Sequence, residues 1–373
     1  MKKQFAALEL HYQIKELKQL IGAKVDKIYN PNKREVVINF YISSKGKKIL
    51  RALVPNTIYI TKHKQDYPQT PSGFCVLLRK HLENTKLRDI NQFGFERIVE
   101  FFFESKDGKK RLIFELFSKG NIVLCKEDYS IIMPLEVQRW SERTVKPKVK
   151  YEYPKKDFNF LELKQDDLTE LIKKSRKILV KTLAIDIGLG GVYAEELCLQ
   201  AEVDKNKKEI SDEDIKSLIK ASKRLRNKKT KPAVVYEKQG PKDIVPIELN
   251  FYKEFKKEQF KTYNDALDSV LTKALVKREK NQKLSKHQKQ IEKLKTIVEK
   301  QEQHVEKLEK DIKENTKKAE LIYENYKVVE NILNQLRKAK QKLSWKQIKQ
   351  KLEGHKVIKD INEKEKVVVL ELK

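Results

Sequence analysis

The segment from about Leu284 to Leu336 carries apolar side chains at heptad spacing, and this feature most constrains what the chain can fold into. The a and d positions of this repeat form a seam along the helix. All seam positions except Gln301 and Asn315 are apolar or aromatic, and Lys, Glu and Gln fill most positions between them. The seam is Ile291, Leu294, Val298, Gln301, Val305, Leu308, Ile312, Asn315, Ala319, Ile322, Tyr326, Val329, Leu333 and Leu336. This pattern predicts a coiled-coil arm, and a solvated single helix is the alternative.

As one helix, this segment would extend on the order of 80 Å, which is too long to fold back into a small globule. After it come a helix stop at Gly354 and a strand-like Val367 to Leu370, and no second heptad run follows. The seam is therefore expected to pair with another chain, with a second copy through self-association, or with sequence absent from this polypeptide.

The 373 residues include 83 Lys and Arg against 54 Asp and Glu, a net charge of +29. Such an excess favours a polyanionic partner, and nucleic acid or an anionic membrane surface would both satisfy it. The sequence has no apolar run of the roughly 18 residues that a membrane span needs, and no signal peptide opens it. We expect a soluble, cytoplasmic protein with no membrane partner.

The cysteines and histidines are scattered, without the spacing of a metal site or a disulfide framework. Cys75, Cys125 and Cys198 each lie in an apolar pattern and are expected to be buried thiols. We therefore expect no metal and no cofactor.

The chain is predicted to be α+β. Residues 1–155 combine strand-like alternation with helical patterns at residues 5–21 and 72–84, which indicates a β-sandwich or rolled sheet with two covering helices. Asp107-Gly108 is a hairpin signal within it. Residues 157–230 are helical, 231–262 are predicted to be a linker with short strands, 263–318 the arm, and 319–373 a small helical tip. Thr262 or Asn264 can cap the arm.

Within the helical region, Gly188, Gly190 and Gly191 lie between two predicted helices, as in a helix-hairpin-helix. Glycines there let the backbone approach a phosphate, and the second helix offers free N–H groups. The alternative is a tight turn between two core helices. Nearby basic residues, Lys181 and the run 223–231, favour phosphate contact, although such a run can also be a solvated linker.

No nucleotide-binding glycine loop, serine nucleophile motif or zinc motif is present in the sequence. The ionisable residues that stand out in apolar surroundings are Glu9 and the pair Glu96-Arg97. The pair could orient a phosphate or an amine, or it could be an internal salt bridge.

Four segments together resemble the NFACT family, which includes NEMF and the bacterial and archaeal proteins once called fibronectin-binding proteins. They are Pro68 to Leu82, Phe95 to Glu100, Glu115 to Leu124 and GLGGVYAEELCLQA from Gly188, and the similarity extends to Gly22 to Tyr29 and Ala319 to Leu333. Their order and spacing run in register over nearly the whole chain.

The resemblance implies ribosome-associated quality control without a covalent active site, so the protein is expected not to be an enzyme. Members bind the large ribosomal subunit obstructed by peptidyl-tRNA, recruit tRNA and support C-terminal tailing of the stalled chain. The tail-directing Asp and Asp-Arg pair of the family fall on Glu9 and Glu96-Arg97, which would lie near tRNA. Contacts with RNA phosphates, including rRNA, are expected from Arg79, Lys80, His81, Gly188, Gly190 and Gly191.

The resemblance also implies a glycosylase-like first domain, a helix-hairpin-helix, an antiparallel coiled coil with a small helical tip, and a C-terminal NFACT-R domain. The returning helix and NFACT-R are not in this sequence, so a truncated chain or a second, NFACT-R polypeptide is expected. A DNA-binding or repair relative of formamidopyrimidine DNA glycosylases is the alternative. Lys2-Lys3 replaces the Pro-Glu pair of those enzymes, which argues against base excision. A surface adhesin is a third reading, which the basic charge disfavours.

Overall fold

The computed structural model describes residues 4–65, 67–106, 108–156, 158–238, 240–362 and 365–372, with the side chains of residues 278, 279 and 282–287 excepted. Lys2, Lys3 and Asp107, which the sequence analysis singled out, lie outside this description. The chain divides into two compact units, residues 1–278 and 279–373, and each is described by itself.

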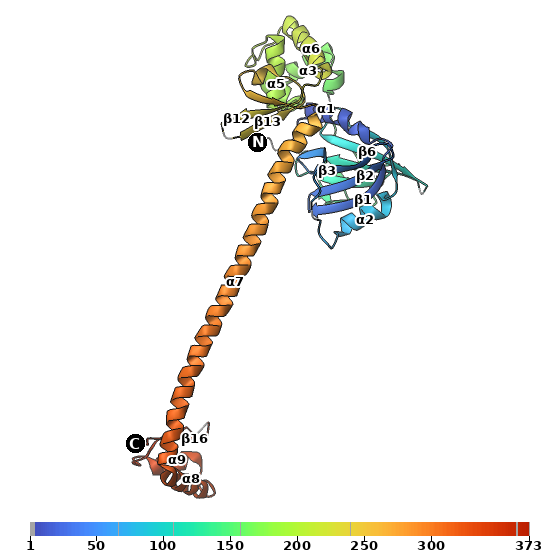
Figure 1. The fold of residues 1–373 in the computed structure, drawn as a ribbon. Coiled ribbons are helices and arrows are strands. Elements are labelled where there is room, and N and C mark those ends of the chain that lie inside the picture. Colours follow the sequence, from blue (N-terminus) through green and yellow to red (C-terminus); the bar gives the residue numbers. More distant parts are fainter. Residues whose placement is uncertain are drawn as a thin grey trace. The chain divides into compact units, whose positions relative to one another are not determined.

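The first unit contains one large antiparallel sheet of nine strands in the order β4-β3-β2-β1-β5-β6-β7-β8-β9 (Figure 1). The strands are β1 (Lys24–Asn32), β2 (Glu35–Ile42), β3 (Gly46–Leu53), β4 (Thr57–Thr61), β5 (Lys86–Gln92), β6 (Ile98–Ser105), β7 (Gly108–Glu115), β8 (Asn121–Lys126) and β9 (Ile131–Pro134). β1 and β5 pair only at Lys24 and Lys86. This pair and the backbone hydrogen bonds beside it, such as that from the Val25 N–H to the Thr85 carbonyl at 2.9 Å, join two halves, β1–β4 and β5–β9.

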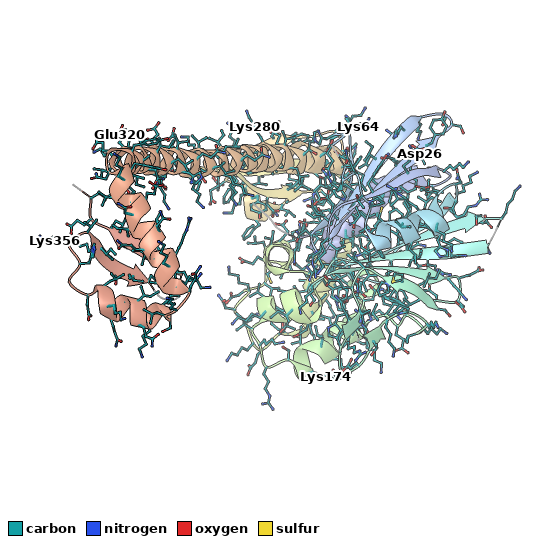
Figure 2. The ribbon with its side chains drawn as sticks, turned by 90° about the horizontal axis from the view of Figure 1, so that it is seen from below. Asp26, Lys64, Lys174, Lys280, Glu320 and Lys356 are labelled. Carbon is teal, nitrogen blue, oxygen red and sulfur yellow. The ribbon has the colours of Figure 1, made fainter. Side chains whose placement is uncertain are left out.

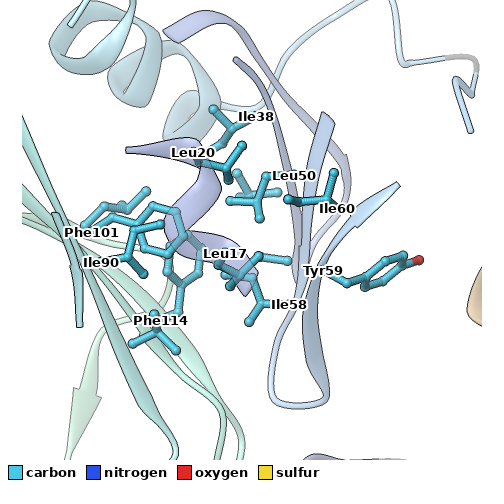
Figure 3. Close-up of a cluster of buried hydrophobic side chains, with 14 of the residues drawn as sticks. Leu17, Leu20, Ile38, Leu50, Ile58, Tyr59, Ile60, Ile90, Phe101 and Phe114 are labelled. Atoms are coloured by element: carbon cyan, nitrogen blue, oxygen red, sulfur yellow. The ribbon is translucent and has the colours of Figure 1, made fainter. Parts of the chain in front are cut away.

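Helix α1 (Ala7–Leu17) and the short turn η1 (Lys18–Leu20) supply side chains to the core between these halves. Figure 3 shows Leu17 and Leu20 between residues of β2–β4, such as Leu50, and residues of β5–β7, such as Phe101. The expected sandwich is thus one continuous sheet folded over α1. The first helix packs against the sheet as predicted, but it is not an outer cover, because eight of its residues are buried and they belong to two different cores.

Helix α2 (Gly73–Leu82) begins at Ser72, whose hydroxyl accepts the N–H of Cys75 at 3.2 Å. It packs on β1, as Figure 1 shows, through a buried face of Cys75, Leu78 and Leu82. After β9 the chain forms a small hairpin, β10 (Gln138–Arg139) with β11 (Thr144–Val145).

The helical region of the first unit packs around a second hydrophobic core. Its elements are η2 (Phe160–Glu162), α3 (Gln165–Lys174), α4 (Leu179–Lys181), the π-helical turn η3 (Thr182–Asp186), α5 (Gly191–Ala201) and α6 (Asp212–Asn227). Leu8 and Tyr12, one turn apart on α1, contribute to this core, so α1 lies between the two cores. The Tyr12 hydroxyl donates to the carbonyl of Leu225 on α6 at 2.8 Å and fixes this arrangement.

Residues 231–262 contain the predicted short strands, but they pack into the first unit instead of forming a linker. They form η4 (Asn250–Tyr252) and a three-stranded sheet in the order β13-β12-β14, with β12 (Ala233–Glu237), β13 (Gly240–Val245) and β14 (Lys256–Gln259). Val235, Val245 and Leu249 belong to the second core. The apolar runs of this segment are short, so its sequence pattern offered little indication that much of it is buried.

Helix α7 (Tyr263–Glu324) begins in the first unit, where Tyr263, Ala266 and Leu267 join the first core. Its start is capped twice. The Thr262 hydroxyl accepts the N–H of Asp265 at 3.0 Å, as predicted, and the carboxylate of Glu16 accepts the N–H groups of Tyr263 and Asn264 at 2.7 Å each.

Residues 288–320 of α7 are exposed without exception, the apolar seam included. In Figure 2 the side chains drawn along α7 up to the labelled Glu320 project outward from the helix. The helix therefore carries its heptad seam at its surface. That the seam forms a coiled coil stays a prediction.

The second unit ends with α8 (Tyr326–Lys340), α9 (Trp345–Leu352) and a hairpin of β15 (Ile358–Asn362) and β16 (Val367–Leu370). The prediction of one seam from Leu284 to Leu336 is wrong beyond residue 324. Asn325 leaves the helical conformation, with φ −105° and ψ 25°, and Leu336 is buried against Ile348 and Ile358. The predicted helical tip thus also contains strands. In the described part of the chain, no helix is long and apolar enough to cross a bilayer.

Candidate functional site

The first unit contains a cavity of about 490 Å³ whose wall comes from four separate parts of the chain. These are the N-terminal residues before α1, the β5–β6 turn, the segment after β11, and the loop from η3 into α5. The lining residues are Gln4, Phe5, Ala6, Ala7, Phe95, Glu96, Arg97, Lys156, Ala184, Ile185, Gly188, Leu189, Gly190, Gly191, Val192 and Tyr193. The sequence-predicted residues Glu96, Arg97, Gly188, Gly190 and Gly191 are brought together here.

The β5–β6 turn places Glu96 and Arg97 in the wall. The Phe93 N–H donates to the Ile98 carbonyl at 3.1 Å, and the Glu96 N–H donates to the Phe93 carbonyl at 3.0 Å. Gly94 has a φ of +50°, a conformation that glycine adopts readily. The turn is therefore tightly closed, and its two charged residues have fixed backbone positions.

Arg97 is directed at the N-terminal segment. Its Nη1 donates to Gln4 Oε1 at 3.1 Å and lies 3.5 Å from the Phe5 carbonyl oxygen. Burial lowers the pKa of Arg97, and the nearby Glu96 carboxylate opposes that shift. A guanidinium at this position supplies positive charge and planar hydrogen-bond donors to the pocket.

Glu96 forms its ion pair with Lys156, at 2.5 Å between Nζ and Oε1. The salt bridge of Glu96 is thus formed with a lysine of another loop, and not with the neighbouring Arg97 as the alternative interpretation of the sequence suggested. The rings of Phe93 and Tyr153 stack 3.7 Å apart, which joins the same two loops a second time. Lys156 was missed from the sequence because it lies in a lysine-rich stretch with no periodicity that would single it out.

Two glycines shape the loop between η3 and α5. Gly188 and Gly190 have φ of +85° and +77°, in the region that favours glycine. A Cβ on Gly188 would lie 2.6 Å from the Nζ of Lys156, so the missing side chain leaves room for that ammonium group. Gly190 precedes α5 without a side-chain cap, and the positive end of the helix dipole adds to the pocket.

Glu9 lies behind the pocket instead of in its wall. Its carboxylate accepts the Ala6 N–H and the Tyr193 hydroxyl, both at 2.9 Å. Burial is the main cause that raises the pKa of Tyr193 well above its usual value, and Glu9 adds to it. Glu9 is fully buried, so its side chain does not reach the surface of the pocket, and that it lies near tRNA stays a prediction. The carboxylate instead connects the start of α1 to α5.

Arg79, Lys80 and His81 lie on α2 and are not among the pocket residues. Arg79 donates to the Ile28 carbonyl at 2.7 Å and lies 3.7 Å from a Glu83 oxygen, so its guanidinium already has internal partners. Lys80 is exposed. Burial and then the neighbouring Lys110 and Lys80 lower the pKa of His81. This α2 cluster is a separate surface.

All three cysteines are buried and unpaired with one another, as predicted. In the residues that the structure describes, no three His, Cys, Asp or Glu side chains are grouped as a metal site would need. The pocket thus offers one carboxylate, two cations and a glycine-rich backbone.

Comparisons with known proteins identify the family. The sequence model described as NFACT N-terminal and middle domains matches residues 7–367. The chain is 35% identical over 397 residues to "Archaeal Rqc2 homolog aRqcH" of Methanocaldococcus jannaschii, covering 100% of this chain and 59% of that protein. It is 30% identical over 182 residues to "Ribosome quality control complex subunit NEMF" of Homo sapiens, covering 48% of this chain and 17% of that protein.

A solved structure shares the fold. The N-terminal part of the fibronectin/fibrinogen-binding protein of Streptococcus suis superposes with a TM-score of 0.59 at 22% identity, covering 72% of this chain and 100% of that one. The chain spans little more than half the length of its archaeal relative. From the match over residues 7–367, the chain belongs to the NFACT family and corresponds to its N-terminal and middle domains.

Proposed function

We propose that this chain is the RNA-binding part of a ribosome quality-control factor. It binds the large ribosomal subunit that carries stalled peptidyl-tRNA, recruits tRNA and supports C-terminal tailing of the nascent chain. The names of its relatives support this proposal, since the human relative is called a ribosome quality control complex subunit. The partners are then rRNA, tRNA and the large subunit in the cytoplasm.

The observation that carries the proposal is the pocket. Glu96-Arg97 and the Gly188–Gly191 loop are far apart in the sequence, and they line one cavity in the first unit. Lys156 connects them, because its ammonium group pairs with Glu96 and occupies the space above Gly188. A net charge of +29 adds long-range attraction for RNA.

The protein acts in this proposal by binding and orientation, without a covalent step of its own. Arg97 and Lys156 contact phosphate oxygens, and Glu96 sets the position of Lys156 and accepts hydrogen bonds from the RNA. Glu9 supports them indirectly by holding α1 to α5. Arg79, Lys80 and His81 would supply a second contact, in which Lys80 is the most accessible cation.

The exposed seam of α7 provides the other interaction surface in this proposal. Its partner is an NFACT-R polypeptide or a C-terminal half that supplies a returning helix, and self-association through the seam is the alternative. Since helix stability in water comes mainly from packing an amphipathic face, adding that partner should raise the helical circular dichroism signal and its thermal midpoint. An unchanged signal with a bound partner would contradict pairing through the seam.

Co-sedimentation with purified large ribosomal subunits tests the proposal. The chain is expected to move into the ribosomal fractions in moderate salt, more strongly when the particle carries peptidyl-tRNA, and to be released as the salt concentration rises. Equal recovery with empty and obstructed particles would contradict the recognition of stalled complexes. No shift at low salt, with the C-terminal polypeptide present, would end the idea.

A further inference from the structure

A second hollow of the first unit lies where α7 begins, beside the start of β3 and the end of β4. Its volume is about 540 Å³. The charged residues that line it come from three segments, and they are Lys47, Lys48, Lys62, Lys261, Asp265 and Asp268. We call this cavity the α7 hollow. Ammonium groups gathered around one hollow repel one another, so the stability of the fold does not explain the cluster.

The two aspartates of the α7 hollow are engaged in fastening α7 to the sheet. The Asp268 carboxylate accepts the Thr61 hydroxyl at 2.6 Å and the Lys62 N–H at 3.1 Å. Asp265 lies in the first turn of α7, where the helix dipole favours negative charge, and it accepts the Thr262 hydroxyl at 2.7 Å. Both carboxylates therefore serve the fold and offset the lysines only in part.

The lysines of the α7 hollow are weakly paired. Lys62 Nζ lies 3.6 Å from Asp265 Oδ1, and 88% of the Lys62 side chain is exposed. Lys47 pairs at 3.1 Å with an aspartate of β1, and about half of the Lys47 side chain is exposed. Lys48 and Lys261 form no ion pair with the residues that the structure describes. Ion pairs this exposed are weak, so all four ammonium groups are available to an anion.

The backbone around the α7 hollow is held in place by hydrogen bonds from side chains. The Asn264 amide accepts the N–H of Ile60 and donates to the carbonyl of Ile60, at 2.7 Å each, which closes the edge of β4. The Glu16 carboxylate accepts the N–H groups of Tyr263 and Asn264 at the start of α7. The α7 hollow is thus preformed, and a bound anion would order little more than lysine side chains.

Adjacent phosphate groups match this chemistry better than a single carboxylate does. The ammonium group of lysine binds phosphate oxygens as a compact point charge. Two or more neighbouring phosphates carry enough negative charge to balance ammonium groups that come from three segments. The volume of the α7 hollow also lies in the range of roughly 300–1,000 Å³ that is typical of small-ligand sites.

We propose that the α7 hollow binds closely spaced phosphate groups, with Lys48 and Lys261 as the first contacts. Lys47 and Lys62 join when they exchange their carboxylate partners for phosphate oxygens. The backbone of an RNA helix and a free polyphosphate both carry such groups, and experiment can separate these two sources. The inference goes beyond the proposed function, because the α7 hollow shares no lining residue with the pocket at Arg97.

Isothermal titration calorimetry of the full 373-residue chain with inorganic tripolyphosphate tests the free source. Binding should weaken about tenfold in the double variant Lys48→Ala with Lys261→Ala, because two charge contacts are lost. The matched control is Lys216→Ala with Lys220→Ala, which removes two exposed lysines of α6 outside the α7 hollow and should leave binding unchanged. Lys62→Ala serves if the first double variant fails to fold, and it should weaken binding in the same direction.

Fluorescence anisotropy with a labelled blunt RNA duplex tests the RNA source. The logarithm of the binding constant should fall linearly with the logarithm of the salt concentration. Lys48→Ala with Lys261→Ala should reduce this slope by about 2, since two phosphate contacts are removed, and the α6 control should leave the slope unchanged.

Each combination of results has a distinct meaning. A loss for tripolyphosphate alone assigns the α7 hollow to a free polyphosphate, and a reduced duplex slope, with or without that loss, assigns it to the RNA backbone. Equal behaviour of the two double variants with both probes, or binding of neither probe, would overturn the inference. Absence of ribosome co-sedimentation, while tripolyphosphate still binds at the α7 hollow, would end the proposed function alone.

Discussion

Two carboxylate–cation pairs of the first unit have the same separation and different surroundings. Arg51 Nε and Glu35 Oε1 lie 2.5 Å apart, and only 2% and 1% of these side chains are exposed. Lys156 Nζ and Glu96 Oε1 are also 2.5 Å apart, with 24% and 23% exposed. The first pair joins neighbouring strands of the folded sheet, and the second joins two loops at the pocket.

The difference shows which pair is available for binding. Water and a ligand cannot reach the Arg51–Glu35 pair, so breaking it leaves a buried charge without a partner. The Lys156–Glu96 pair is partly solvated, so a phosphate can replace the carboxylate as partner of the ammonium group at small cost. The sheet pair therefore stabilises the fold, and the pocket pair can change partners.

Removing the buried carboxylate should have the largest effect. Glu35→Ala leaves Arg51 buried and unpaired, and we expect a loss of about 3–5 kcal/mol in the free energy of unfolding. Denaturant unfolding followed by circular dichroism measures it. The double variant Glu35→Leu with Arg51→Met should recover most of the loss. A destabilisation below about 1 kcal/mol for Glu35→Ala would contradict the contrast between the two pairs.

Gly188→Ala should have an intermediate effect. An alanine at a φ of +85° costs roughly 1–2 kcal/mol, and its Cβ would displace the Lys156 ammonium group, which lies 2.6 Å away. The control is Gly191→Ala, since no atom lies within 4 Å of a Cβ there. Thermal unfolding and RNA anisotropy should separate the two variants, with reduced RNA affinity only for Gly188→Ala. Equal behaviour of both variants would contradict the role of Gly188.

Acidification should destabilise the first unit through His11 on α1. Burial, and then the charge of Lys15, lowers the pKa of His11 to about 4 from the 6.5 of an exposed histidine. The unfolded chain thus binds more protons between these values, so stability is fully present above pH 6.5 and falls as the pH decreases toward 4. The thermal midpoint of His11→Gln should depend less on pH in this window. A slope as steep as that of the unmodified chain would assign the pH dependence to other groups.

Glu96→Gln should change the free energy of unfolding by less than about 1 kcal/mol, because the pair is partly solvated. The matched measurement on Glu35→Gln should show a larger loss. If the two variants unfold at the same denaturant concentration, solvation does not separate the two pairs.

Leu308→Ser should have the smallest effect on the chain alone, within about 0.5 kcal/mol, because Leu308 is exposed on the seam. Leu336→Ala, in the buried core of the second unit, should lower the stability of that unit measurably. The two substitutions thus compare the exposed and the buried parts of the segment whose sequence pattern predicted one continuous seam. A large loss for Leu308→Ser without a partner would mean that the seam is already packed.

Much of this fold could be predicted from local patterns. Alternation identified β2–β4 and β6–β9 of the large sheet but not β1 and β5, and Ser72 and Gly188 marked where helices begin or turn. Glu96 and Arg97 stood out as charged residues in an apolar pattern. These features are local in the sequence. Each depends on a periodicity, a capping residue or a glycine conformation that a short segment determines by itself.

What could not be predicted depends on contacts between distant segments. Glu96 pairs with Lys156 sixty residues away, and Glu9 is buried by Tyr193 of α5. In the sequence, Lys156 cannot be told apart from many other lysines. Only the folded chain places the loop at Gly188 beside it. The end of α7 was missed for another reason: the apolar spacing continues past Asn325, although the side chains there pack into a different core.

The most direct test of whether this pocket contacts RNA is photo-crosslinking followed by peptide mapping. The chain is crosslinked to large ribosomal subunits that carry peptidyl-tRNA. RNA binding at this pocket should give RNA-crosslinked peptides that contain Glu96-Arg97, Lys156 and the loop around Ile185. These crosslinks should be lost in Lys156→Glu but not in Lys155→Glu. Crosslinks confined to α2 or to α7, with the pocket peptides unmodified in a bound complex, would contradict it.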